Sequence, residues 1–259
     1  MIGEQAGSAV ALITGGASGI GAALARRLAG HGWQVVVADL DTTAAARVAE
    51  ECGGRFVTTD VASADDNERA VAYTVEEFGR LDAAVLNAAI AGRCGLHDFT
   101  PQRYRDTMRT DLDGVVYGLH AALPRMRRQG GGHIVITGSI AGLTGSPDVF
   151  YASAKHALIG LVRSAAPLLE PDRIRLNTVC PGLVDTPVLA SARAALLARG
   201  LLLADPDEVA AAVETVLADE RTGQAWSVQA GRTAVPIELP VVHLASCSPS
   251  DKEQPRRTT

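Results

Sequence analysis

Tyr151 and Lys155 are four residues apart on a predicted helix, so their side chains would share one face. A free tyrosine ionises at about pH 10, and a cation within several ångströms favours the tyrosinate. Beside Lys155, Tyr151 could therefore act as a base for the proton of an alcohol. A solvated Tyr/Lys pair of this spacing is common, so the alternative is a pair without chemistry.

A second stretch with chemical potential runs from Ala9 to Gly21. Its apolar run, residues 9–13, is typical of a buried parallel strand. Gly15 permits a turn that a Cβ would obstruct, while Gly19 and Gly21 let the backbone approach a ligand or strand. The helix that begins here would direct free N–H groups at a pyrophosphate. The spacing is not G-x-G-x-x-G, so a plain tight turn is the alternative.

Asp39 ends the second apolar run, about 20 residues beyond the glycine turn. An acid at this position can hydrogen-bond a ribose 2′-hydroxyl, and it repels a 2′-phosphate. Neither Ser18 nor Leu40 supplies a cation nearby, so we predict NAD rather than NADP as the cofactor. The alternative for Asp39 is a helix-start acid near Asp41.

Alternating strands and helices position these residues. The predicted strands are residues 9–13, 35–38, 55–58, 83–86, 133–137, 174–179 and 225–229. The predicted helices are residues 19–30, about 42–51, one from the cap Ser63 to Gly79, one or two within 102–128, about 150–169, and one that begins at Asp205. This order predicts an α/β fold, a single doubly wound Rossmann-type domain with a seven-stranded parallel sheet and helices on both faces. Ligands in such sheets bind beyond the carboxyl ends of the strands.

Five motifs follow one another along the chain. They are Thr14-Gly15-x3-Gly19-x-Gly21, Asn87-Ala88, Ser139, Tyr151-x3-Lys155 and Pro181-Gly182-x-Val184-x-Thr186. Together they resemble the classical short-chain dehydrogenase/reductase family over about residues 8–231. The resemblance implies one dinucleotide-binding domain, a homo-oligomer (dimer or, more usually, homotetramer) and hydride transfer between a nicotinamide and an alcohol or carbonyl.

The resemblance also implies residue roles. Tyr151 would be the acid/base, and Lys155 would hold the nicotinamide ribose and stabilise the tyrosinate. Ser139 would hydrogen-bond the substrate oxygen, with a strand-end turn serine as the alternative, and for Thr186 the alternative is a helix cap. Asp60 and Val61 would flank the adenine. The predicted cofactor contacts are Gly15, Ser18, Gly19, Ile20, Gly21, Asp39, Leu40, Asp60, Val61, Asn87, Ala88, Tyr151, Lys155, Pro181, Gly182, Val184 and Thr186.

The sequence departs from the family pattern in several places. The family's catalytic asparagine is matched by Asp111, which we include with the predicted catalytic residues. Ala89 stands where the family has a glycine. Ser139 precedes Tyr151 by twelve positions, one fewer than usual, which indicates a shortened loop at 145–150. That loop affects the expected shape of the substrate pocket more than the chemistry.

The C-terminal third is predicted to close the site and then to extend past it. Residues 188–203 are rich in Ala and Leu, with Arg193 and Arg199 as their only charges. We interpret them as a lid (about 188–204) over an apolar pocket, because two cations make a poor polar face for the alternative, a membrane-surface helix. The catalytic domain is expected at 1–234. Residues 235–259 form an extension, whose polar distal part is expected to be disordered.

Composition excludes several classes of function. The 259 residues carry a net charge of −5 without a basic stripe, so no nucleic-acid partner is expected. The four cysteines form no C-x-x-C pair, so neither a zinc site nor a disulfide framework is expected, and reduced thiols suit the cytoplasm. We see no signal peptide and no membrane span. No metal is required.

The sequence therefore predicts an NAD-dependent short-chain alcohol dehydrogenase or ketone reductase. Its substrate would be a small hydrophobic secondary alcohol or ketone, of an alicyclic or steroid-like kind. One alternative is an NADPH-type carbonyl reductase. Another is a nucleotide-sensing binding protein of the same fold without turnover; Ser139, Tyr151 and Lys155 argue against it, and Asp111 leaves it open.

Overall fold

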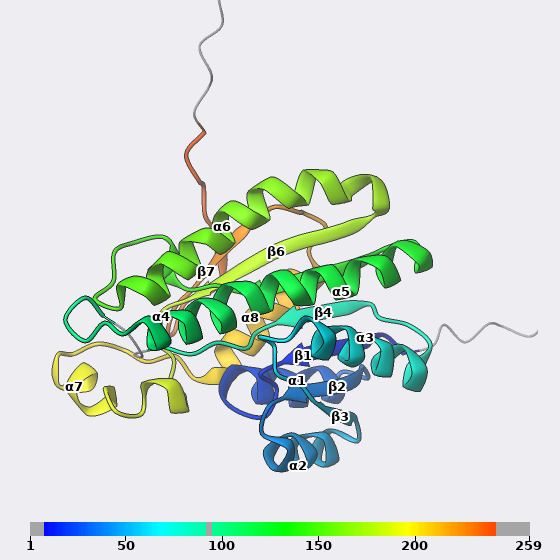
Figure 1. Cartoon of the computed structure of the whole chain (residues 1–259), viewed down its shortest axis with the longest axis horizontal. Coiled ribbons are helices and arrows are strands. Elements are labelled where there is room, and N and C mark those ends of the chain that lie inside the picture. Colours follow the sequence, from blue (N-terminus) through cyan, green and yellow to red (C-terminus); the bar gives the residue numbers. More distant parts are fainter. Residues whose placement is uncertain (1–7, 92–94, 242–259) are drawn as a thin grey trace, which may run out of the picture.

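A central sheet carries helices on both faces in the computed structural model of the chain (Figure 1). The structure describes residues 8–91 and 95–241. The strands within these residues are β1 (Val10–Thr14), β2 (Gln34–Asp39), β3 (Arg55–Thr58), β4 (Ala83–Leu86), β5 (Gly132–Thr137), β6 (Ile174–Pro181), β7 (Ala225–Val228) and β8 (Val235–Pro236). Their order in space is β3-β2-β1-β4-β5-β6-β7-β8. The first seven strands are parallel, which confirms the doubly wound fold.

The sheet differs from the expected one by its last strand. The described residues form eight strands rather than seven, because β8 pairs antiparallel with β7. In this register Pro236 lies opposite Trp226, and Val235 lies opposite Ser227. A two-residue strand has no alternation that a sequence could reveal, and proline is tolerated at a sheet edge because no further strand needs its N–H.

The helices begin and end largely where their capping residues predict. They are α1 (Gly19–Gly30), α2 (Thr42–Cys52), α3 (Ala64–Phe78), α4 (Pro101–Met108), α5 (Gly114–Gln129), α6 (Val149–Leu169), α7 (Arg193–Ala198) and α8 (Pro206–Ala218). Ser63 Oγ accepts the Asp66 N–H at the start of α3, and Gly79 ends that helix with a φ of 77°. Asp205 and Glu208 form a reciprocal capping box at α8.

Two apolar cores lie on opposite faces of the sheet. On β1, Ile13 packs into the core with α1, α2 and α8, whereas Leu12 packs into the core with α3, α5 and α6. Neighbouring residues of a strand point to opposite faces, so a strand buried on both faces must be apolar throughout. The burial of all five β1 residues explains the continuous apolar run in the sequence. Figure 1 shows α5 and α6 on the viewer's side of the sheet.

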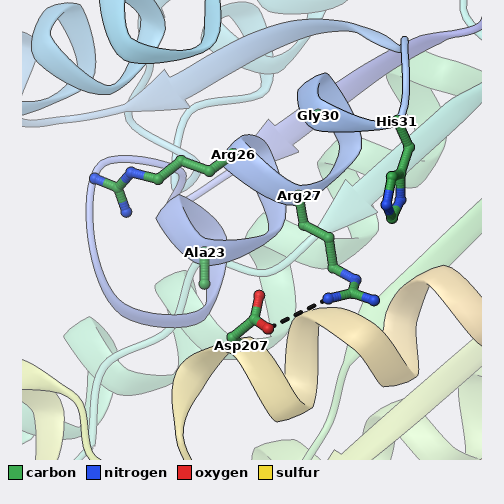
Figure 2. Close-up of a pocket in the computed structure, with 6 residues that line it drawn as sticks. All are labelled: Ala23, Arg26, Arg27, Gly30, His31 and Asp207. Carbon is green, nitrogen blue, oxygen red and sulfur yellow. Dashed lines mark hydrogen bonds and ion pairs between the residues drawn. The ribbon is translucent and has the colours of Figure 1, made fainter.

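Charged side chains fix α1 to the neighbouring helix α8. Arg27 pairs with Asp207 at 3.2 Å and donates to Glu214 at 2.7 Å, and His31 contacts the same Glu214. Figure 2 shows Arg27, His31 and Asp207 around a shallow hollow, with Arg26 directed away from the ion pair between Arg27 and Asp207. Arg26 instead pairs with Glu51 on α2. Because each pair is partly exposed, it adds little stability alone and mainly orients the helices.

The start of the C-terminal extension packs on its own subunit. Ile237 and Leu239 lie against an apolar cluster that includes Ile159 on α6, and Arg163 donates to the Pro240 carbonyl at 2.9 Å. Residues 236–244 are mostly apolar, so the sequence predicts that they need cover, for which a neighbouring subunit is one candidate. Within the described portion, up to 241, packing on α6 covers Ile237 and Leu239, whereas Val241 remains exposed. The expected disorder at 246–259 lies outside the described residues.

Two further findings concern the described part of the chain as a whole. None of its helices combines the length and the apolar character that a membrane span requires. Nor does it contain a group of three or more His, Cys, Asp or Glu side chains placed to hold a metal ion. Cys52 and Cys180 are free thiols, whereas Cys94 and Cys247 lie outside the described residues.

Candidate active site

The turn between β1 and α1 can be built only from glycine at three positions. Gly15 and Gly19 have φ values of 62° and 49°, in the left-handed region that favours glycine. A Cβ on Gly15 would lie 2.8 Å from the backbone of Ala88. On Gly21 it would lie 2.1 Å from the Gly15 carbonyl oxygen. The turn is therefore held against the end of β4, and the N-terminus of α1 stays open to the adjoining cavity.

That cavity has a volume of about 760 Å³ and lies along the carboxyl ends of the parallel strands. Most residues predicted from the sequence line it together. They are Gly15, Ser18, Gly19, Ile20, Asp39, Leu40, Asp60, Val61, Asn87, Ala88, Ser139, Tyr151, Lys155, Pro181, Gly182, Val184 and Thr186. Gly21 lies behind the turn, and Asp111 lies behind Lys155; neither is part of the lining. The volume is within the range of cofactor and ligand sites.

Asp39 braces the glycine turn from the end of β2. Its Oδ2 accepts the Ala17 N–H at 3.0 Å, and its Oδ1 accepts the Asp41 N–H at 3.0 Å. The cap of α2 is Asp41, whose side chain accepts the Ala44 N–H. The acid at the helix start is therefore Asp41 and not Asp39, and Asp39 lines the cavity.

Asn87 connects the ends of three strands. Its Nδ2 donates to the carbonyls of Thr14 and Gly15 at 3.1 and 3.2 Å, and its Oδ1 accepts the Thr137 hydroxyl at 3.1 Å. The sequence assigned Asn87 only to the cofactor trough and missed Thr137. The signal for Thr137 was its position at the end of β5, where polar residues of a parallel sheet face the ligand edge.

Ser139 and Tyr151 approach the cavity from two different elements. Ser139 follows β5, and its Oγ accepts the Ala141 N–H at 3.1 Å, so it caps the short 3₁₀ turn Ile140–Gly142. Ser139 therefore makes the hydrogen bond expected of a turn serine at a strand end, and it also lines the cavity. Tyr151 lies in the first turn of α6, where its N–H is capped by Asp148 Oδ1 at 3.4 Å.

Lys155 is buried beneath Tyr151, with only 1% of its side chain exposed. Its Nζ lies 5.4 Å from the centroid of the Tyr151 ring and donates to the Thr137 carbonyl at 3.1 Å. The i, i+4 spacing has therefore placed the phenol and the ammonium on one face of α6, as the sequence predicted. Such a cation favours the tyrosinate by direct attraction.

Asp111 is fully buried on the far side of Lys155, with its Oδ1 3.8 Å from Nζ. It lies in a π-helical segment, Arg109–Asp113, between α4 and α5. Its Oδ1 accepts the Ile90 N–H at 2.9 Å, so the residue does not cap a helix turn. The carboxylate therefore approaches the lysine from a π turn, a helix irregularity that is frequent at functional sites.

Burial raises the pKa of Asp111 from 3.8 to about 6. The attraction of Lys155 and the Ile90 N–H lower this pKa by less than burial raises it, and the charge of Asp148 raises it further. The second oxygen, Oδ2, has no hydrogen-bond partner among the described residues. A carboxyl in this setting changes charge near neutral pH, so the electrostatic support of Lys155 depends on pH.

Part of the predicted lid lines the cavity. It contains a short 3₁₀ turn, Pro187–Leu189, and helix α7, with Leu189 and Leu196 facing the cavity. The Thr186 side chain does not cap that turn, because its hydroxyl donates to the Val184 carbonyl instead. Its methyl group lies close to Gly19, where an added Cβ would contact it. The helix-cap alternative for Thr186 is therefore not supported.

The doubly wound sheet with a cavity at its carboxyl edge defines a Rossmann-type α/β protein. Residues 9–197 match the family model described as short chain dehydrogenase, and the chain belongs to this family of oxidoreductases. It is 36% identical over 239 residues to cyclohexanol dehydrogenase of Acinetobacter sp. (strain SE19), covering 87% of this chain and 95% of the relative. It is 38% identical over 249 residues to cis-4-hydroxycyclohexanecarboxylate dehydrogenase of Sinomonas cyclohexanicum, covering 90% and 100%.

Solved structures agree with this assignment. A crystal structure of 3-ketoacyl-(acyl-carrier-protein) reductase from Brucella melitensis, complexed with NADH, superimposes with a TM-score of 0.77 and 26% identity. The match covers 85% of this chain and 96% of that one. The two proteins therefore share their fold over most of this chain.

Proposed function

We propose that the protein transfers hydride between NAD(H) and a hydrophobic secondary alcohol or the corresponding ketone. The observation that carries the proposal is the joint position of Ser139, Tyr151 and Lys155 in one cavity with the glycine turn. Relatives named for cyclic secondary alcohols, and a structural neighbour complexed with NADH, support the same reaction class. The resemblance of the five motifs supports the individual roles.

The lining fits a dinucleotide. The turn at Gly15 and Gly21 has no room for a Cβ, so the backbone can approach a pyrophosphate beside the N-terminus of α1. Asp39 would accept hydrogen bonds from the adenosine ribose, and Asp60 with Val61 would flank the adenine. Residues 181–186 would hold the carboxamide. When bound, the nicotinamide would supply the hydride acceptor or donor.

The chain's own residues would handle the proton. In oxidation, Tyr151 Oη would take the proton of the substrate hydroxyl while hydride leaves the carbon that carries this hydroxyl. In reduction, Tyr151 Oη would return the proton to the substrate oxygen. The Ser139 hydroxyl would donate to the substrate oxygen and fix its position. Lys155 would stabilise the tyrosinate and donate to the nicotinamide ribose. The apolar lid would exclude water from this step.

Activity with cyclohexanol tests the proposal directly. We expect NADH absorbance to appear when the purified protein is mixed with NAD and cyclohexanol, and the reverse change with cyclohexanone and NADH. The ring fits the aliphatic lining and carries one secondary hydroxyl. No turnover in either direction with NAD or NADP, by protein that binds the cofactor, would favour the nucleotide-sensing alternative instead.

Asp39 should make the protein prefer NAD over NADP. We expect the KM for NADP to exceed that for NAD by at least about tenfold, because the carboxylate repels a 2′-phosphate. Asp39→Asn should narrow this ratio, since an amide keeps the acceptor for the Ala17 N–H but loses the charge. Asp41→Asn is the matched control and should leave the ratio unchanged. A native protein with tighter NADP binding would contradict the assignment.

We also propose a homo-oligomer built on α5 and α6. Each helix exposes a large aliphatic side chain, Val116 at 40% and Leu168 at 75%. Such side chains are stabilised when a second subunit covers them. Light scattering at micromolar concentration should give the mass of a dimer or tetramer, whereas a monomer at that concentration would refute this proposal.

A further inference from the structure

The lid is closed at its base by a backbone bridge. The Asp185 N–H donates to the Ala204 carbonyl at 2.9 Å, and the Ala204 N–H donates to the Leu183 carbonyl at 2.8 Å. These bonds belong to the parallel bridge between Val184 and Ala204, both of which are buried. The chain between them is therefore a loop whose two ends are held together beside the sheet.

The rest of the lid is only lightly attached to the molecule. None of the residues 187–203, all of which the structure describes, is fully buried. Backbone hydrogen bonds in this range close its own turns, such as those that Leu196 and Leu201 donate to the carbonyls of Ala192 and Leu196. A segment with few buried groups opens at a low free-energy cost. Its position is therefore sensitive to a single additional contact.

That contact is an ion pair between Arg193 on α7 and Asp185 at the base of the lid. Arg193 Nε lies 2.9 and 3.0 Å from the two carboxylate oxygens, and a second guanidinium nitrogen lies 2.9 Å from Oδ2. Among the described residues, this is the one ion pair that the lid forms. The hydrogen bond from Arg193 lowers the pKa of Asp185, so the pair stays charged at neutral pH. Two donors on one carboxylate also restrict its geometry.

The ion pair supports the cavity wall without being part of it. Neither Asp185 nor Arg193 belongs to the lining, whereas Ala192 and Leu196, one residue before and three residues after Arg193, both do. Asp185 directly precedes Thr186, which lines the cavity and is a proposed cofactor contact. The pair therefore connects the apolar wall of the lid to the segment proposed to hold the nicotinamide.

We propose that the Asp185–Arg193 pair positions Leu189 and Leu196 against the substrate and so determines a preference for ring-sized alcohols over small ones. The inference rests on the proposed function and concerns the substrate specificity of the same site. A cyclohexyl ring is stabilised by the wall that the lid completes, because ring and wall exclude water together. Propan-2-ol carries the same secondary hydroxyl but only two methyl groups, so it buries much less apolar surface against the lid.

The test compares cyclohexanol with propan-2-ol, each oxidised with saturating NAD. The quantity measured is the ratio of kcat/KM for cyclohexanol to kcat/KM for propan-2-ol, in which a change in the folded fraction cancels. Asp185→Asn and Arg193→Gln should each lower this ratio by about three- to fivefold, the upper range for an exposed ion pair of good geometry. The loss should appear in KM for cyclohexanol, with kcat within about twofold of the native value, because both residues act only by positioning the lid.

The double variant Asp185→Asn/Arg193→Gln shows whether the two residues act as a pair. Its ratio should equal that of either single variant, because each single variant already breaks the pair. Arg26→Gln is the matched control: Arg26 pairs with Glu51 at nearly the same exposure and does not line this cavity, so the ratio should stay native. A ratio that neither single variant lowers, or single effects that add in the double variant, overturns the inference.

Limited proteolysis provides a readout that needs no turnover. Chymotrypsin cleaves after leucine, and residues 196–203 of the lid are rich in leucine. Asp185→Asn should raise the initial rate of cleavage in this range by about three- to fivefold, followed by mass spectrometry, whereas Arg26→Gln should not. An unchanged rate overturns the inference whether or not the alcohols are substrates. Absence of turnover of both alcohols by the native protein overturns the proposed function instead, and the cleavage rate then decides the role of the pair.

Discussion

Replacing Tyr151 with phenylalanine is expected to lower kcat for alcohol oxidation by at least about 100-fold. The variant removes the phenolic oxygen that would take the alcohol proton. It keeps the ring, whose centroid lies 5.4 Å from Lys155 Nζ, and therefore keeps the local packing. NAD affinity should stay within about threefold of the native value, because the remaining cofactor contacts are untouched. Stopped assays of NADH formation and fluorescence titration with NADH measure the two quantities separately.

Tyr73→Phe is the matched control for this result. Tyr73 lies on α3, packs against the apolar core shared with α5 and α6, and is not part of the cavity lining, so losing its hydroxyl should leave kcat unchanged. If Tyr151→Phe retained native turnover with normal NAD binding, another group would have to move the proton. The assignment of Tyr151 as acid/base would then be wrong.

The parallel sheet was predictable because its strands are buried on both faces. The continuous apolar runs at β1 and β2 reflect that burial, and caps such as Ser63 and Asp205 define helix starts locally. By contrast, β8 has two residues and one is a proline, so nothing periodic reveals it. The π-helical segment was also invisible, since its five residues, Arg109–Asp113, are too few to show a period of their own.

The sequence was sufficient to predict which residues lie together at the candidate site, but not which groups their side chains contact. Each predicted residue near a strand end lines the cavity because parallel strands deliver their carboxyl ends to one edge. The partners of those residues come from elsewhere: Lys155 binds the Thr137 carbonyl, and Asp111 binds the Ile90 N–H. Such contacts depend on how α6 and the π turn pack against β5, which no local motif records.

Asp111→Asn should move the rising limb of the pH–rate profile to lower pH by about one unit, a roughly tenfold gain in kcat/KM at a pH below that limb. Above pH 6 the native carboxyl is mostly charged, because its pKa is about 6. Its charge, 3.8 Å from Lys155 Nζ, offsets part of the attraction that favours the tyrosinate. Asparagine keeps an acceptor for the Ile90 N–H and removes that charge. The measurement is kcat/KM across pH 5–10 under NAD saturation.

Stability provides an independent readout of the same carboxyl. Its pKa is raised from 3.8 to about 6 in the folded state, so between these values the folded protein holds its proton more tightly than the unfolded chain. The free energy of unfolding therefore falls as pH rises through this window, by about 3 kcal/mol from this group. Denaturant unfolding at pH 4 and pH 7 should show this loss in the difference between the native protein and Asp111→Asn.

The two readouts separate the explanations of Asp111. A shifted pH–rate profile together with the stability difference means that the carboxyl acts on Tyr151 through Lys155, as a positioning residue. Superimposable profiles with the stability difference intact would leave Asp111 a buried acid without influence on the reaction. Loss of both signals would mean that Asp111 is an ordinary carboxylate in solution, contrary to its complete burial beside Lys155. Because Asn restores the residue of the family pattern, a rate gain at every pH would instead mean that Asp111 reduces catalytic power for some other advantage.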